Sequence, residues 1–289
     1  METGYTLSQQ QYVPLHLHTE YSLLDGAIRT TQLCEFAKEN NMPAVAITDH
    51  GVMYGALDLY IHAKDIGVKP IIGCEFYVTT GDIKDKSQNN REYFHLVLIA
   101  KNETGYKNLI KLVSIAQIDG FYYKPRINYE LLKTYHEGLI CLSACLQGEI
   151  CQTLLKKSYQ ETLEVAKFYK ELFNDDYYLE IQDHGLPDQK RTNPDIIKIG
   201  KELDIPLVIT NDSHYLKKED ANWHDTLLCI QTNSLKEDTN RFRFSNDEFY
   251  VKTVDELRES FKWLDSDTFN EAIENTVKVA DKCHLIIEL

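Results

Sequence analysis

The sequence lacks the features of an exported or membrane-spanning protein. No apolar run approaches the roughly 18 residues that a membrane helix needs, and the first ten residues, METGYTLSQQ, contain neither a cationic segment nor an apolar core. The seven cysteines show no paired CxxC spacing, which argues against a disulfide framework in a chain of 289 residues. These absences predict a cytoplasmic protein without membrane insertion.

Positive charge is also scarce. Lys and Arg number 31 against 45 Asp and Glu, which gives a net charge of −14. This argues against a broad basic surface that holds nucleic acid by counterion release, and a phosphodiester substrate would need local cations such as bound metals. Hydrophobic residues at 43% and charged residues at 26% are typical of a globular protein.

Residues of metal-ligand type follow apolar runs at several places along the chain. The run VPLHLH carries His16 and His18, which a strand would present on the same face because its side chains alternate. AVAITDH ends in Asp49 and His50, KPIIGCE ends in Glu75, and LVITNDSH ends in an Asp, a Ser and a His. This recurrence predicts one metal site assembled at the ends of many strands.

Seven apolar runs alternate with amphipathic stretches. This alternation favours a parallel sheet with right-handed crossovers, closed into a barrel of seven strand–helix units. After residue 215 the alternation of strands and helices ends, and helical patterns at 219–231 and 269–283 predict a mostly helical extension. The final apolar run HLIIEL is expected to continue in a longer chain. The predicted strands are 13–18, 44–47, 69–78, 94–100, 139–143, 177–181 and 207–210.

The succession HxH, TDHG, GCE, a strand histidine and NDSH resembles the PHP family, the polymerase and histidinol phosphatase superfamily. The resemblance implies an α/β fold, a distorted (β/α)7 barrel with up to three metals at one mouth. It implies that His16, His18, Glu75 and Asp212 hold one metal, that Glu75, His95 and Cys145 hold a second, and that Asp25, His50 and His214 hold a third.

Further motifs resemble the N-terminal region of bacterial DNA polymerase III alpha subunits. They are DGFYYKPRI, SACLQGEI, NDSHYLKKEDANWHDTLLCIQT and RFRFSNDEFYVK. The resemblance implies a metal-binding barrel over residues 1–214 and an extension over 215–289 that leads towards the polymerase palm. Partners implied in the same way are the remaining polymerase domains, the 3′ end of a DNA primer, a separate proofreading exonuclease subunit and other replisome subunits.

The ligand types restrict the metal. Imidazoles, carboxylates and one thiolate suit Zn, Mn or Fe, whereas Mg prefers oxygen ligands alone. We expect two or three divalent ions, with Glu75 bridging two of them. Water on such an ion can have its pKa lowered to roughly 7, so no protein nucleophile is required. Cys145 has a competing interpretation as a packing residue.

The most direct functional hypothesis is a 3′-5′ proofreading exonuclease in which Glu75, Asp212 and His184 serve catalysis. His184 could instead be a solvated loop residue. The cluster FYYKPR could stack bases while Lys124 and Arg126 meet phosphates, or could pack against a neighbouring domain. The competing hypotheses for the whole chain are a metal-stabilised module that docks a partner and a small-molecule phosphatase resembling histidinol phosphatase.

Overall fold

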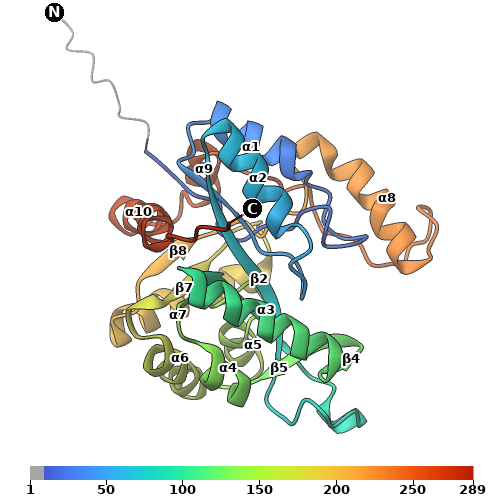
Figure 1. Ribbon diagram of the computed structural model, residues 1–289, viewed down its shortest axis with the longest axis vertical. Helices are drawn as coiled ribbons and strands as arrows, with labels where there is room; N and C mark the ends of the chain where they lie inside the picture. The colour runs from blue at the N-terminus through green and yellow to red at the C-terminus, as the bar shows by residue number, and fades with distance from the viewer. Residues whose placement is uncertain (1–9, 289) are drawn as a thin grey trace, which may run out of the picture.

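A computed structural model describes residues 10–288, in which strands form a curled sheet with helices around it (Figure 1). The N-terminal stretch in which we expected no export signal lies almost wholly outside the described residues. Three predicted strands have the predicted bounds, and the others differ by one residue or, at 13–18, in kind. The strands are β1 (Ala44–Ile47), β2 (Lys69–Thr79), β3 (Phe94–Ala100), β4 (Phe121–Tyr122), β5 (Lys124–Asn128), β6 (Leu139–Leu142), β7 (Tyr177–Ile181) and β8 (Leu207–Ile209).

Helices connect most of the strands. The two helices predicted after residue 215 are present as α8 and α10, whereas α9 was not predicted. None of the helices in residues 10–288 has the length and apolarity that crossing a membrane requires. The helices are α1 (Thr30–Glu39), α2 (Ala56–Ile66), α3 (Glu103–Ile118), α4 (Tyr129–Tyr135), α5 (Glu149–Lys156), α6 (Tyr159–Phe173), α7 (Pro187–Leu203), α8 (Ala221–Thr232), α9 (Val254–Ser260) and α10 (Ser266–Lys282).

Residues 13–18 close the barrel, although they form isolated bridges instead of the predicted strand. On one side, Ala46 of β1 donates its N–H to the Pro14 carbonyl at 3.2 Å. On the other side, the His18 N–H donates to the carbonyl of Ser213, beyond β8, at 2.8 Å. The ring therefore runs from 13–18 through β1, β2, β3, β6, β7 and β8. Its seven positions confirm the predicted distorted (β/α)7 barrel.

One strand of the ring runs against the others, so the prediction of a wholly parallel sheet was wrong. β3 pairs antiparallel with both β2 and β6. The first residues of β3 therefore lie at the mouth where the other strands end. His95, the second residue of β3, faces Tyr77 across the ladder and reaches the same mouth as residues that follow strands.

The barrel interior is filled by apolar side chains, and α10 contributes to it. Val279 and Cys283 belong to the same buried cluster as Val13, Ile99 and Val208. In addition, the Lys69 ammonium of β2 donates to the Ala280 carbonyl at 2.6 Å. Residues of the predicted extension therefore take part in the barrel core, while the division of the chain at residue 214 stays a prediction.

Candidate metal centre

The nine predicted ligands lie together at one mouth of the barrel. His16 and His18 come from the closing segment, and Glu75 and His95 come from the paired strands β2 and β3. Loops supply the other five ligands. They are Asp25 in the loop after the closing segment, His50 after β1, Cys145 after β6, and Asp212 and His214 after β8.

Glu75 is the centre of the arrangement because four imidazoles surround its buried carboxylate. His50 Nδ1 lies 2.5 Å from Oε2, and His95 Nδ1 lies 2.8 Å from Oε1. His16 Nε2 is 3.2 Å from Oε1, and His18 Nε2 is 3.7 Å from Oε2. A single carboxylate with both oxygens shared in this way can contact more than one cation.

Three overlapping groups of side chains could each hold a metal ion, with ligand atoms within 4.8 Å of one another. One of them lies wholly within a set implied by the family resemblance, and the other two each combine members of different sets. Asp25 lies beside the third group, since its Oδ2 is 3.2 Å from His50 Nε2. The groups are His16, His18 and Glu75; His50, Glu75 and His95; and His18, His50 and His214.

Cys145 and Asp212 complete the surroundings of Glu75. The Cys145 thiol sulfur lies 3.7 Å from His95 Nδ1, and Asp212 Oδ1 lies 3.0 Å from His18 Nε2. Asp212 adopts a left-handed backbone conformation, with φ of 42°. This conformation is uncommon outside glycine, and asparagine and aspartate tolerate it better than most residues do.

Two buried polar atoms at the centre have no hydrogen-bond partner, His16 Nε2 and Asp25 Oδ1. Buried polar atoms are nearly always paired, so such orphans call for an explanation. Both atoms are of metal-ligand type; His16 Nε2 faces Glu75 and Asp212, and the other carboxylate oxygen of Asp25 contacts His50. The donor set therefore fits divalent cations that accept nitrogen, oxygen and sulfur ligands.

Glu180 of β7 orients His16 and was missed in the sequence. Its buried carboxylate accepts hydrogen bonds from His16 Nδ1 at 2.8 Å, from the Ala144 N–H at 2.7 Å and from the Thr210 hydroxyl at 2.5 Å. Because Glu180 holds the proton on Nδ1, the nitrogen that His16 can offer to a cation, in exchange for a proton, is Nε2, which faces Glu75 and Asp212. Carboxylates commonly fix ligand histidines in this way. The available signal was a carboxylate within the otherwise apolar run YYLEI.

The charges of the cluster shift its pKa values in opposite directions. Burial alone lowers the pKa of His16, but the negative charges of Glu180 and Asp212 outweigh it and hold that pKa well above its usual value. Burial and the positive charges of His50 and His214 lower the pKa of His18 to about 3. The neutral His18 thus keeps a free lone pair for a cation.

Burial and the neighbouring charges also shift the pKa values of the acidic groups Glu75 and Cys145. Burial tends to raise the pKa of Glu75, but the positive charges of His95 and His50 keep it well below its usual range. Burial, followed by the negative charge of Asp212, raises the pKa of the Cys145 thiol. The carboxylate is therefore ionised at neutral pH, whereas the thiol needs a neighbouring cation to become a thiolate ligand.

His184 does not join this centre. Its Nε2 donates to the Asn211 carbonyl and its Nδ1 accepts from the Gln189 amide, both at 2.8 Å, while its ring stacks on Phe249. Burial lowers the pKa of His184 to about 4, so the ring is neutral. The predicted general-acid or substrate-contact role conflicts with this geometry, because both nitrogens already have protein partners.

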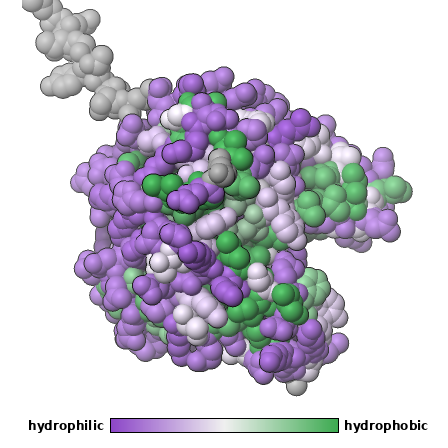
Figure 2. All heavy atoms as spheres, viewed as in Figure 1, coloured by the Kyte–Doolittle hydropathy of each residue, from purple (hydrophilic) through white to green (hydrophobic). Residues whose placement is uncertain are grey.

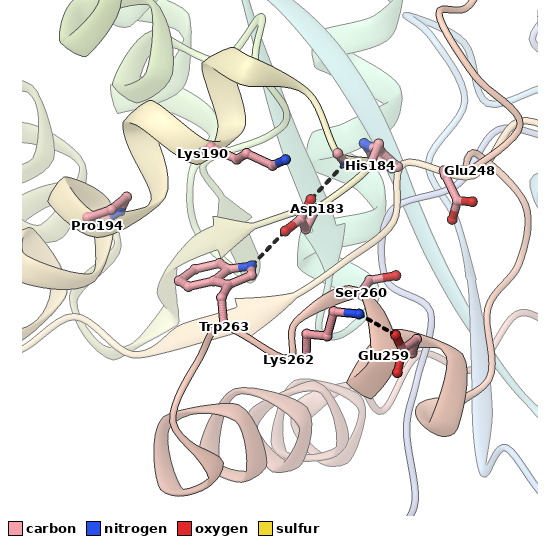
Figure 3. A pocket seen from close by; sticks show the side chains of 10 residues that line it. Asp183, His184, Lys190, Pro194, Glu248, Glu259, Ser260, Lys262 and Trp263 are labelled. Carbon is pink, nitrogen blue, oxygen red and sulfur yellow. Dashed lines mark hydrogen bonds and ion pairs between the residues drawn. The ribbon is translucent and has the colours of Figure 1, made fainter.

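Figure 3 shows His184 at a separate pocket of about 710 Å³, in which Trp263 donates to Asp183 at 2.6 Å.

Arg126 does not have the phosphate-binding role that the sequence suggested. Its guanidinium is buried and donates to the carbonyls of Gly120, Ile83 and Asp85, so it fixes the loop before β3 instead of meeting a phosphate. Lys124 remains beside the metal centre, on the wall of the cavity that contains Asp25 and His50.

Comparison with known proteins gives the family. The PHP domain model matches residues 14–184. DNA polymerase III subunit alpha of Campylobacter jejuni is 47% identical over 290 residues, covering 96% of this chain and 24% of that protein. The same subunit of Borreliella burgdorferi is 43% identical over 277 residues, covering 95% of this chain and 24% of that protein.

The chain thus spans about a quarter of the length of these curated relatives. Among solved structures, an amidohydrolase from Chromobacterium violaceum aligns with a TM-score of 0.48 and 13% identity, covering 70% of this chain and 87% of that one. A two-domain protein from Bacteroides vulgatus, titled as containing a predicted PHP-like metal-dependent phosphoesterase, aligns with a TM-score of 0.43 and 12% identity, covering 94% and 69%. The chain belongs to the PHP domain family.

Proposed function

We propose that the chain hydrolyses phosphodiester bonds at a centre of two or three divalent metal ions, and that it removes nucleotides from the 3′ end of a DNA primer as a 3′-5′ proofreading exonuclease. In this proposal it acts as part of a DNA polymerase III alpha subunit, with the remaining polymerase domains as its partners. The observation that carries the proposal is the convergence of three metal-capable groups on Glu75.

The proposed ligands are the nine side chains at the mouth of the barrel. Bound ions would supply positive charge to a phosphate and would lower the pKa of a water molecule. The chain's own residues hold and orient these ions: Glu75 is shared between groups, and Glu180 keeps His16 Nε2 free. The ligands are His16, His18, Asp25, His50, Glu75, His95, Cys145, Asp212 and His214.

Charge supports a need for metals. The chain carries a net charge of −14, and the carboxylates of Glu75, Asp212 and Asp25, which are part of that count, lie at the centre itself. A phosphodiester approaching this mouth would be repelled unless cations were bound there. Metal binding and phosphate binding are therefore coupled in the proposed reaction.

The test is degradation of 5′-labelled single-stranded DNA by the purified chain with Mn²⁺ or Zn²⁺. The matched variant is Asp212→Asn, because asparagine keeps the side-chain shape and tolerates the left-handed backbone at φ of 42°. We expect shortening from the 3′ end by the parent and a loss of at least about 100-fold in the variant, because changes to groups that only orient metal ligands already cost up to about 100-fold. Equal rates for parent and variant, or no degradation by either, would contradict the proposal.

A second function is favoured by an apolar surface. Trp223, Ile230, Leu235 and Phe242 are exposed on and after α8, where Figure 2 shows apolar atoms on the protruding part of the molecule. Such a surface suits docking of other domains. In the corresponding proposal, the metals stabilise the barrel and the chain docks the polymerase body or a separate exonuclease subunit. Retention of full nuclease activity by a full-length polymerase carrying Asp212→Asn would favour this docking function.

A further inference from the structure

We propose that an aromatic shelf beside the metal centre stacks the unpaired terminal bases of a single-stranded nucleic acid, and so selects unpaired over paired ends. The shelf consists of Tyr54, Phe121 and Tyr123. The inference deepens the proposed hydrolysis and rests on it, since the backbone of the stacked strand would continue into the metal centre.

The shelf and the metal centre share one cavity. A cavity of about 460 Å³ has Asp25 and His50 on one wall and the three shelf residues with Lys124 on the others. This volume is within the range of small-ligand sites and could hold a nucleotide unit. Continuity between the metal-capable side chains and the rings is the observation that points to one ligand spanning both.

The rings of the shelf are unusually open to solvent. Tyr54 is 63% exposed, Phe121 49% and Tyr123 59%. Large aromatic side chains are mostly buried in folded proteins, so a group of exposed rings at a cavity marks a binding surface. Stacking suits such rings because every base offers a π-face, whatever its sequence.

The hairpin that carries two of the rings is held firmly against the centre. β5 pairs with β2 in register Tyr77↔Arg126. Gly51, which follows His50, allows the close approach: a Cβ at this position would lie 2.6 Å from Pro125 Cγ. The hairpin therefore sits directly beside the exit of β1, and its tip can be a fixed platform.

The backbone of Tyr123, at the tip of the hairpin, is a second indication that the shelf is a binding surface. Tyr123 has a φ of 60°, a left-handed conformation that bulky residues rarely adopt. Strained backbone of this kind concentrates at functional sites. Glycine or asparagine would turn the chain here at lower cost, so we infer that the aromatic side chain itself is the reason for the residue.

Two cationic side chains lie beside aromatic rings that line this cavity. The Lys124 ammonium is 5.2 Å from the centroid of Tyr77, and the Arg91 guanidinium is 4.5 Å from the centroid of Tyr123. In a chain with a net charge of −14, these local cations favour a ligand that carries phosphates. A duplex fits the shelf poorly, because its internal base faces are covered by neighbouring base pairs and a terminal base must be unpaired before it can enter among the rings.

The experiment measures binding of the complete chain to fluorescein-labelled oligothymidylate of ten nucleotides by anisotropy. Low salt favours binding, Mn²⁺ occupies the metal centre, and phosphorothioate linkages in every strand prevent cleavage. The variants are Phe121→Ala and Tyr123→Ala, and the matched control is Phe242→Ala, an exposed ring after α8. A second ligand, an abasic strand of the same length, retains the phosphates but has no bases. Thermal melting of each variant checks that the fold is kept.

We expect each shelf variant to bind oligothymidylate roughly 5- to 150-fold more weakly, the range for loss of one base–aromatic stack. The control should bind like the parent, and the abasic strand should bind weakly to all. The inference is overturned if the shelf variants bind like the parent, if the abasic strand binds as tightly as oligothymidylate, or if the parent binds neither; the last result would favour a protein segment on the shelf.

Cleavage with added Mn²⁺, measured separately, distinguishes this inference from the proposed function. An inactive parent with ring-dependent binding would remove the hydrolysis and support the shelf. Cleavage of single strands at the parental rate by both shelf variants would overturn the shelf and leave the hydrolysis standing.

Discussion

Glu180→Gln is the most informative change outside the proposed ligands. The carboxylate of Glu180 accepts from His16 Nδ1 and Thr210 on one oxygen and from the Ala144 N–H on the other. A glutamine offers one oxygen and one NH₂ group, so it cannot accept from all three donors. The substitution therefore forces a choice between two unfavourable arrangements.

In one arrangement the amide NH₂ faces the Ala144 N–H, and two donors are left opposed in a buried site. In the other, the NH₂ donates to His16 Nδ1, and the imidazole proton must move to Nε2. That tautomer has no lone pair for a cation. An unsatisfied buried donor costs about 1–3 kcal/mol, and loss of an orienting partner typically weakens metal binding by about 10- to 100-fold, or roughly 1.4–2.8 kcal/mol.

Competition between the chain and a chelator of known affinity, with Zn²⁺ or Mn²⁺ near pH 7.5, measures this loss directly. ¹⁵N NMR of the His16 ring reports which nitrogen carries the proton. We expect weaker metal binding by about 10- to 100-fold and a shift of the proton from Nδ1 to Nε2 in part of the population.

Glu149→Gln is the matched control. Glu149 is also a buried carboxylate, but its partners are the hydroxyls of Tyr129 and Tyr169, outside the metal centre. In the glutamine variant one hydroxyl can still donate to the amide oxygen, and the other can accept from the amide NH₂, so both stay paired. Our account of Glu180 is refuted if Glu180→Gln binds metal as tightly as the parent, or if Glu149→Gln loses as much affinity.

Three further predictions concern stability. Chelator should lower the melting temperature by several degrees, because ions that bind only the folded chain stabilise it by about 2.7 kcal/mol at 100 times Kd; an unchanged melting curve contradicts this. Because burial lowers the pKa of His184 to about 4, the unfolded chain binds more protons below pH 6.5, so stability falls as pH falls. Urea titrations between pH 7.5 and 5 should show a loss about 2 kcal/mol larger in the parent than in His184→Gln; equal losses would contradict the assignment. Ile273→Ala in α10 should cost about 2–5 kcal/mol in urea unfolding of the barrel, whereas a separate transition for residues 215–288 would show that the extension folds alone.

Much of the fold could be predicted from local patterns. The bounds of β1, β3 and β7 follow from short apolar runs between turn residues, and Gly67 ends α2 in the left-handed conformation that such a glycine favours. The α9 helix was missed because it is only seven residues long within a charged stretch. Short helices give too few turns for a periodicity to stand out.

The sequence by itself determined which side chains could bind metals and that they would meet at strand ends, because side-chain alternation and the order of apolar runs are local properties. Only the tertiary structure decided the direction of β3, which brings His95 to the common mouth. It also decided the pairing of His16 with Glu180, 164 residues away, and the burial of His184 between protein partners. The physical reason is that a strand's pattern shows which faces are buried, but not which way the strand runs or which distant group fills the space beside it.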